Sequence, residues 1–238
     1  MQTRLMAVSI LGASFILGCI VFGAFIYQSR VPDKNIKVVG AATQRLVSDI
    51  IKWRITLSRT TGLGDVKNGY SLLKSDLRSL KGLLKANGIG VKEITIQPVN
   101  TSSIYGQYER GGLIGYAIQQ NVFVISRKVS DVEKMALNPN LLSDQGIILQ
   151  SSNLEYYFSR LNDIKKTLLA AATADAKRRA EAIADSSGDR IGRIESARSG
   201  VFQITEPYST DFMDYGVYNT MTKEKDITVT VHAIFTLN

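Results

Sequence analysis

The amino-acid sequence predicts an α+β protein of two βαββ halves, with helices packed on antiparallel or mixed sheets, behind one N-terminal transmembrane helix. Three observations lead to this prediction. An uncharged apolar run stands near the start of the chain, alternating and helical hydrophobic patterns succeed each other after it, and the order strand, helix, strand, strand occurs twice. The expected organisation is a tail, a membrane segment, a linker and one domain with two halves: 1–4, 5–27, 28–35 and 36–238, with halves at about 36–127 and 150–238.

The apolar run from Leu5 to Tyr27 contains 23 residues and no charge. A helix of this length reaches about 34 Å, which is enough to cross the hydrocarbon core of a bilayer. Arg4 precedes the run, and Tyr27 stands where an aromatic ring favours the membrane interface. A retained signal anchor accounts for every residue of the run. The alternatives are a cleaved signal peptide, which needs a shorter run and a small-x-small site, and lipidation at Cys19.

The first half opens with a short strand candidate at 36–40 and continues with a clear alternation of apolar and polar residues over 51–57. The period then changes, because apolar residues recur every three or four positions from Val66 to Leu84. This spacing predicts an amphipathic helix that ends at Asn87-Gly88. Strands are expected at about 91–99 and 115–127, with a loop at about 100–112 between them. A short helix at about 130–142, broken near Pro139, completes this half.

The second half repeats the plan. A strand candidate at 154–158 leads into a long helix at about 162–186. The inner face of this helix is expected to consist of Ile164, Leu168, Ala172, Ala176, Ala180 and Ala184. Small residues at every fourth position let a helix lie close to a sheet, which bulky side chains prevent. Strands follow at 191–198 and 226–235, and the pattern leaves open whether the two halves share one sheet.

The order of several short motifs resembles the SIMPL-domain family of bacterial periplasmic and envelope proteins. The run from Asp175 to Ala184 (DAKRRAEAIA), followed by Gly188, Ile191, Gly192 and Ile194, is similar to the characteristic helix and strand of the family. Gly115-Tyr116 before a long strand, the closing strand, and Gly40 with Asp49 nine residues later also fit. The resemblance implies a SIMPL-type fold, an extracytoplasmic location and a tendency to self-associate, and it supplies no catalytic residues. With the anchor, it implies a single-pass protein of the bacterial inner membrane whose C-terminal domain lies in the periplasm or outside the cell.

Motifs of established catalytic chemistry are missing from the sequence, which has no G-x-S-x-G, P-loop, G-x-G-x-x-G or H-E-x-x-H. One Cys and one His leave no zinc-finger arrangement and no Cys-His dyad. His232 falls on the polar phase of the last strand, which favours an exposed histidine over a catalytic base. We therefore expect a protein that is not an enzyme and that uses no metal and no cofactor.

Two groups of residues are candidates for binding. The amphipathic helix that begins near Val66 carries four basic residues beside its leucine stripe: Lys74, Arg78, Lys81 and Lys85. They suit contact with an anionic surface or, alternatively, a solvated helix face. Two loops are rich in tyrosine, which is favoured at interfaces but also packs within its own domain. The candidates for self-association or ligand contact are Tyr105 and Tyr108 in one loop and Tyr208, Tyr215 and Tyr218 in the other.

The formal charge of +8 is concentrated in one part of the chain. Residues 30–100 hold 13 basic and 5 acidic residues, which places the surplus just after the membrane segment. The anchor and the implied location argue against a nucleic-acid partner. The sequence thus predicts a membrane-anchored, non-enzymatic cell-envelope protein that forms a homo-oligomer or binds envelope proteins. The alternative is a ligand-binding module that holds a small molecule or glycan with its tyrosine-rich loops.

Overall fold

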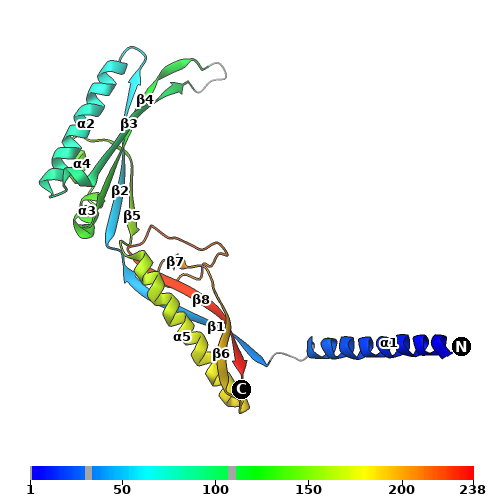
Figure 1. The fold of residues 1–238 in the computed structure, drawn as a ribbon. Coiled ribbons are helices and arrows are strands. Elements are labelled where there is room, and N and C mark those ends of the chain that lie inside the picture. The colour runs from blue at the N-terminus through cyan, green and yellow to red at the C-terminus, as the bar shows by residue number, and fades with distance from the viewer. Residues whose placement is uncertain (1, 30–33, 107–110) are drawn as a thin grey trace. The chain divides into compact units, whose positions relative to one another are not determined.

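The computed structural model of the chain describes residues 2–29, 34–106 and 111–238 (Figure 1). The chain divides into two compact units, and each is described by itself. Unit 1 comprises residues 1–40, 173–198 and 231–238, and unit 2 comprises residues 41–172 and 199–230.

The N-terminal apolar run lies within a helix, α1 (Gln2–Ser29). Side chains of this helix are described from Gly12 to Tyr27, and large apolar ones among them, including Phe15 and Phe22, are exposed. Within the described ranges, no helix combines the length and the apolar character that a membrane crossing requires. The structure therefore supports the helix predicted at 5–27 and identifies no membrane span.

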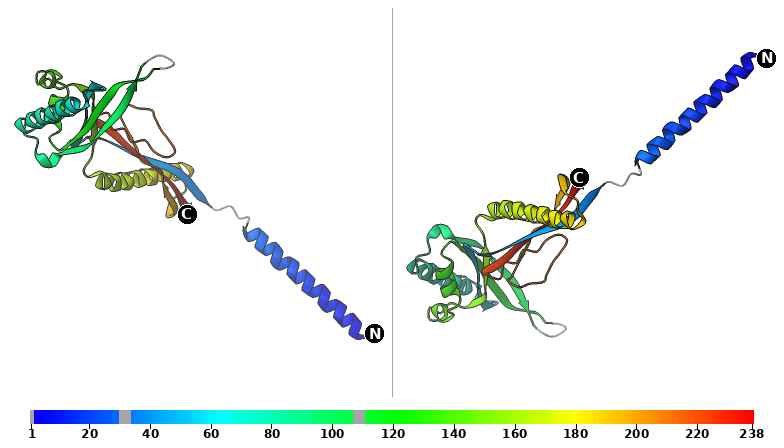
Figure 2. Two further views of the ribbon diagram at one scale, coloured as in Figure 1. Left: turned by 90° about the horizontal axis from the view of Figure 1, so that it is seen from above. Right: turned by 90° about the horizontal axis from the view of Figure 1, so that it is seen from below.

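Two antiparallel sheets with helices confirm the α+β class (Figure 2). One sheet has the order β3-β4-β2-β5, built from β3 (Ile94–Tyr105), β4 (Leu113–Ser126), β2 (Ile50–Gly62) and β5 (Leu149–Tyr157). The other has the order β1-β8-β6, with β7 also paired to β8: β1 (Asn35–Val47), β8 (Glu224–Leu237), β6 (Ile191–Ser199) and β7 (Gln203–Thr205). The helices beside them are α2 (Val66–Ala86), the 3-10 turn η1 (Val91–Glu93), α3 (Val129–Ala136), α4 (Asn140–Ser143) and α5 (Leu161–Ser187).

The sheets do not correspond to the two sequence halves, because each sheet receives one strand from the other half. β5, from the second half, pairs with β2 along nearly its whole length, so that Trp53 lies between Val124 of β4 and Leu154 of β5. In return, β1 from the first half pairs with β8. Only Ser48 and Asp49 separate β1 from β2, yet the two strands enter different sheets.

Several element boundaries differ from the sequence prediction. The strand predicted at 36–40 continues to Val47, because pairing with β8 sustains a run of small and polar residues; Thr43 Oγ1 lies 2.8 Å from Thr228 Oγ1. The loop predicted at 100–112 is strand as far as Tyr105, which pairs with Leu113. The helix predicted at 130–142 is broken beside Pro139, as expected, into α3 and α4, whereas β7 was not predicted.

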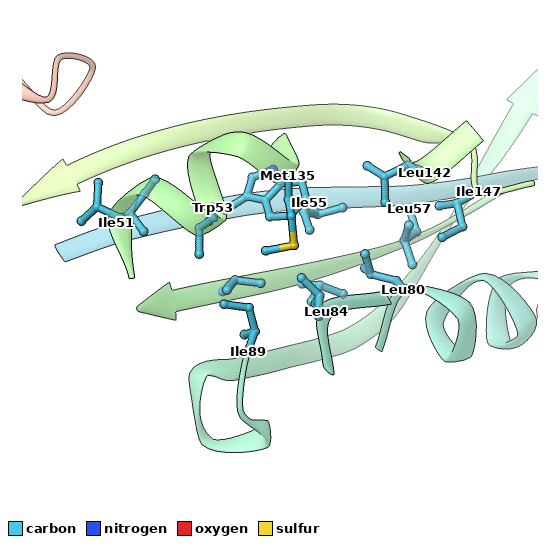
Figure 3. Packing of buried hydrophobic residues seen from close by; sticks show 14 of the residues in the cluster. Ile51, Trp53, Ile55, Leu57, Leu80, Leu84, Ile89, Met135, Leu142 and Ile147 are labelled. Atoms are coloured by element: carbon cyan, nitrogen blue, oxygen red, sulfur yellow. The ribbon is translucent and has the colours of Figure 1, made fainter. Parts of the chain in front are cut away.

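The core of unit 2 is built from large apolar side chains, mostly aliphatic, with Trp53 and Met135 among them (Figure 3). α2 contacts β2 and β4, and α3 contacts β2 and β5. The buried face of α2 presents Leu73, Leu80 and Leu84 to the alternating apolar residues of β2 and β4. At the edge of this core, the carboxylate of Asp76 is buried and accepts two hydrogen bonds of 2.6 Å from the Arg59 guanidinium, which raises the pKa of Arg59. Pairing and hydrogen bonding therefore offset the cost of burying this charge.

Unit 1 has a different core. The second half of α5 lies along its sheet (Figure 1) and contributes only alanines to the buried face, at Ala176, Ala180 and Ala184. The strands supply Val38 and, from β8, Val231, Ala233 and Phe235. The predicted inner face of α5 is confirmed for Leu168 and the four alanines, whereas Ile164 is only half-buried.

Candidate functional site

Many large apolar side chains are exposed in the segment between β7 and β8. We call this the β7–β8 surface and define it by six residues that are each between 44% and 86% exposed: Tyr208, Phe212, Met213, Tyr215, Tyr218 and Met221. Phe212 and Met213 also line a hollow of about 420 Å³ together with Val201 and the β8 residues 228–230. Exposed apolar groups gathered on one segment are typical of an interaction surface.

A buried amide holds the backbone of this segment in place. Gln203 is 7% exposed, and its Nε2 donates to Met213 O at 2.8 Å while its Oε1 accepts from the Val217 N–H at 2.9 Å. The backbone of Ile204 then bonds to both Val217 and Asn219 at 2.8 Å. Residues of β7 therefore bracket the turn at 214–215 and pair with the backbone at 217–219, so that the exposed side chains project from an ordered backbone.

The C-terminal end of the segment is held in the same way. The Asn219 side-chain oxygen accepts hydrogen bonds from the backbone N–H of Met221 and Thr222, at 2.8 and 3.2 Å. Its amide nitrogen donates to the Glu206 carboxylate. Thr220 O accepts from the Tyr156 N–H at 2.8 Å, which ties the segment to β5.

Lys225 is a fully buried lysine at the start of β8. Its ammonium donates to Thr222 O, the carbonyl that ends the segment. Burial lowers the pKa of Lys225 to about 8, and the Glu206 carboxylate opposes this shift. Lys225 lies on the buried side of β8. Its hydrogen bond holds the end of the segment, but its charge loses contact with water.

Tyr208 adopts a left-handed backbone conformation, with φ of 65°. Its ring lies beneath the Arg45 guanidinium, whose Cζ is 4.3 Å from the ring centroid. Arg45 also forms a bidentate pair with Asp226, at 2.8 and 2.9 Å, and this hydrogen bonding lowers the pKa of the Asp226 carboxyl. A non-glycine residue with positive φ costs about 1–3 kcal/mol. The stacked guanidinium stabilises Tyr208 in this conformation and leaves most of the ring open to a partner.

The site offers aromatic rings, thioethers and a hollow with hydroxyl groups, on a backbone that is already ordered. In the part of the chain that the structure describes, no group of three or more His, Cys, Asp or Glu side chains is placed to hold a metal ion.

A family model for the SIMPL domain, described as a protein of unknown function (DUF541), matches residues 36–235. The chain belongs to the SIMPL family. The match includes both sheets, α2 and α5, and leaves α1 outside. No curated protein matches the chain.

The structure separates the tyrosines that the sequence singled out within the SIMPL domain. Tyr208, Tyr215 and Tyr218 lie within the one segment between β7 and β8, and the Tyr218 ring is 6.2 Å from the Tyr157 ring. Tyr105 is exposed at the end of β3, in the other sheet. Tyr108 lies outside the described residues. Phe212, Met213 and Met221 were not predicted, because no periodicity marks them in an irregular segment.

The four basic residues of α2 form a solvent-exposed row on the SIMPL domain. Lys74, Arg78, Lys81 and Lys85 are all exposed, and none forms a salt bridge with another described residue. The arrangement agrees both with a solvated helix face and with contact to an anionic surface. His232 is exposed on β8, as its phase predicts.

Proposed function

We propose that this SIMPL protein is a non-enzymatic cell-envelope protein whose domain assembles with copies of itself through the β7–β8 surface, with envelope proteins as further partners. The observation that supports this most directly is the combination of exposed apolar side chains with an ordered backbone. Aromatic residues and Met are enriched in interfaces. A surface that is ordered before association loses less conformational entropy on binding.

Attachment to a membrane through α1 belongs to the same proposal. The 23 uncharged residues from Leu5 to Tyr27 and the exposed apolar side chains of α1 support it. We place the protein in the bacterial inner membrane with its SIMPL domain in the periplasm or outside the cell. A reporter enzyme that is active only outside the cytoplasm, fused after Asn238, is expected to be active. Activity only of a cytoplasmic reporter would reverse this orientation.

Assembly is tested with the full chain in neutral detergent by sedimentation velocity. Wild type is expected to form one defined oligomer, and the triple variant F212S/Y215S/M221S is expected to be monomeric. The matched control is V91S/L137S, which removes two exposed apolar side chains from elsewhere in unit 2 and should keep the oligomer. A wild type that stays monomeric at high concentration, or a control that dissociates equally, would refute the proposal.

A second candidate function is binding of a small molecule or glycan, and the hollow beside Phe212 and Met213 favours it. Aromatic rings next to hydroxyl groups suit the apolar faces and hydroxyls of sugars. A thermal-shift screen tests this candidate, because a ligand that binds the folded state raises the melting temperature. A ligand whose stabilising effect disappears in F212S would support this function over assembly.

A further inference from the structure

One face of the sheet in unit 1 carries no covering element within the described residues. The second half of α5 packs against the other face, where Val231, Ala233 and Phe235 are buried. The intervening residues of β8, including His232 and Ile234, point away from α5. A Cβ added at Gly192 of β6 would collide with the Thr236 hydroxyl, so alternate residues of β6 from Gly192 onward lie on this open face.

The open face is hollowed at its centre. The hollow has a volume of about 510 Å³ and is lined by side chains from all three strands, among them Lys37, Val39, Ser196, Arg198, His232 and Ile234. Sites for small ligands have volumes of about 300–1,000 Å³. The size therefore suits a group larger than a simple ion.

The charges around this hollow are of one sign. Lys37 lies on β1 and Arg198 on β6, the two strands that flank β8, and two such strands run about 10 Å apart across a sheet. Both are long side chains with several N–H donors, and His232 adds a further nitrogen to the lining of the same hollow. No carboxylate lines the hollow, and neither Lys37 nor Arg198 forms a salt bridge with any described residue.

Apolar side chains lie beside the cationic ones. Val39 is 44% exposed, and Ile234 is half-buried between it and β6. A fully water-soluble anion would leave this apolar surface uncovered. A molecule with an acidic head and an apolar continuation matches both parts of the hollow.

The position of the hollow along the chain indicates the source of such a molecule. Lys37 follows the end of α1 by eight positions, because the helix ends at Ser29. Eight residues span at most about 29 Å when fully extended. A membrane that holds α1 therefore presents its headgroups within reach of this hollow.

We propose that the hollow lined by Lys37, Arg198 and His232 binds the acidic headgroup of an anionic phospholipid, with the start of the acyl chains on Val39 and Ile234. This inference rests on the membrane attachment proposed above. It assigns the lipid contact to the sheet of unit 1 and leaves the basic row of α2 as a solvated surface.

The proposal is tested by titrating the full chain, in neutral detergent, with dihexanoylphosphatidylglycerol and measuring binding by calorimetry. Dihexanoylphosphatidylcholine has the same acyl chains without a net charge, and inorganic phosphate has the charge without the chains. The anionic lipid is expected to bind at least about tenfold more tightly than either comparison compound.

Two charge-matched variants locate the site. K37Q/R198Q is expected to weaken binding of the anionic lipid at least about tenfold, whereas K74Q/R78Q, which removes the same two charge types from α2, should change it less than about twofold. Circular dichroism and the melting temperature verify folding of each variant. If K37Q/R198Q does not fold, R198Q alone is judged by the same direction of change.

Four results would overturn the proposal. These are equal affinity for the two lipids, unchanged affinity in K37Q/R198Q, an equal loss in K74Q/R78Q, and phosphate that binds as tightly as the anionic lipid, which would assign the hollow to a free anion. Carbonate extraction of membranes separates this inference from the anchor. Release of the wild-type chain would refute attachment through α1, while the titration decides the headgroup site independently.

Discussion

The two helix-and-sheet layers exclude water from their cores with side chains of opposite size. α2 buries Leu73, Leu80 and Leu84 against the sheet of unit 2, whereas the second half of α5 buries only alanines against the sheet of unit 1. Leucines remove a large apolar area from water and keep the helix at a distance from the sheet. Alanines remove little area but let the helix backbone approach the strands. Side chains that are equally buried in the two layers therefore respond differently to a change in size. The leucine layer is sensitive to a loss of side-chain volume, and the alanine layer is sensitive to a gain.

The largest expected effect is loss of volume in the leucine layer. Leu80→Ala should reduce the free energy of unfolding by about 3 kcal/mol, because it removes buried methyl groups and leaves a cavity. Urea denaturation measures this, and Leu72→Ala on the exposed side of the same helix should cost much less. An equal loss in the two variants would show that the layer does not depend on its leucines.

The converse change is gain of volume in the alanine layer. Ala180→Leu should destabilise unit 1 by about 2 kcal/mol, because a larger side chain forces α5 away from the sheet. Its control is Ala182→Leu, which lies two positions away on the exposed side. Hydrogen exchange of α5 and β8 amides locates the loss. Unchanged protection in A180L would mean that this helix does not need close approach.

A smaller effect tests an exception within the leucine layer. α2 approaches β2 closely at Gly69, where an added Cβ would collide with Thr61 Cγ2, whereas nothing lies near a Cβ at Gly82. Gly82→Ala should therefore stabilise the protein by about 0.7 kcal/mol through helix propensity. Gly69→Ala should destabilise it by about 1 kcal/mol despite the same gain. If both variants are stabilised in thermal denaturation, α2 is free to shift at its N-terminal end.

The smallest effect concerns the charge on the covered phase of β8, which carries Lys225 in unit 2 and apolar residues in unit 1. The pKa of Lys225 is about 8 in the folded chain, whereas an unperturbed lysine titrates near 10.4. The folded chain therefore binds fewer protons than the unfolded chain at pH 7–9, so stability rises with pH, by a few tenths of a kcal/mol from pH 7 to 8.

Lys225→Met should remove this rise, and urea denaturation at pH 7 and pH 8 measures it. Lys166→Met, at an exposed position of α5, is the control that should retain it. A pH dependence that survives in K225M would assign the proton to another group.

Sequence patterns predicted well which face of each helix or strand is buried, but they predicted poorly which strands pair with one another. The leucine stripe of α2, the alanine stripe of α5 and the alternation in β2 and β8 were all recognised, because a period of 3.6 or 2 states which side chains share a face. β1 was underestimated because its second half, with Gly40, Ala41 and Thr43, has a weak pattern of its own. Pairing with β8 completes it.

The candidate site was likewise predicted only in part. Three tyrosines between β7 and β8 were recognised from composition, but Tyr105 belongs to another sheet, and Phe212 and Met221 carry no periodic signal. The side-chain amide of Gln203 shapes the site because it bonds to both ends of the turn at 214–215. A single glutamine in a short strand gives no sequence indication that its side chain is buried and bonded on both sides.

The sequence by itself determined the α+β class and the two contrasting helices, since both depend on local composition and periodicity. The order of its short motifs resembled the SIMPL family, to which the family-model match then assigned the chain. Only the tertiary structure decided that β1 and β5 enter the sheet of the other half, and that Lys37, Arg198 and His232 surround one hollow. The physical reason is the range of the interactions. A side-chain period specifies a face within one element, whereas a strand's partner is chosen by hydrogen bonds and packing between segments that lie far apart along the chain.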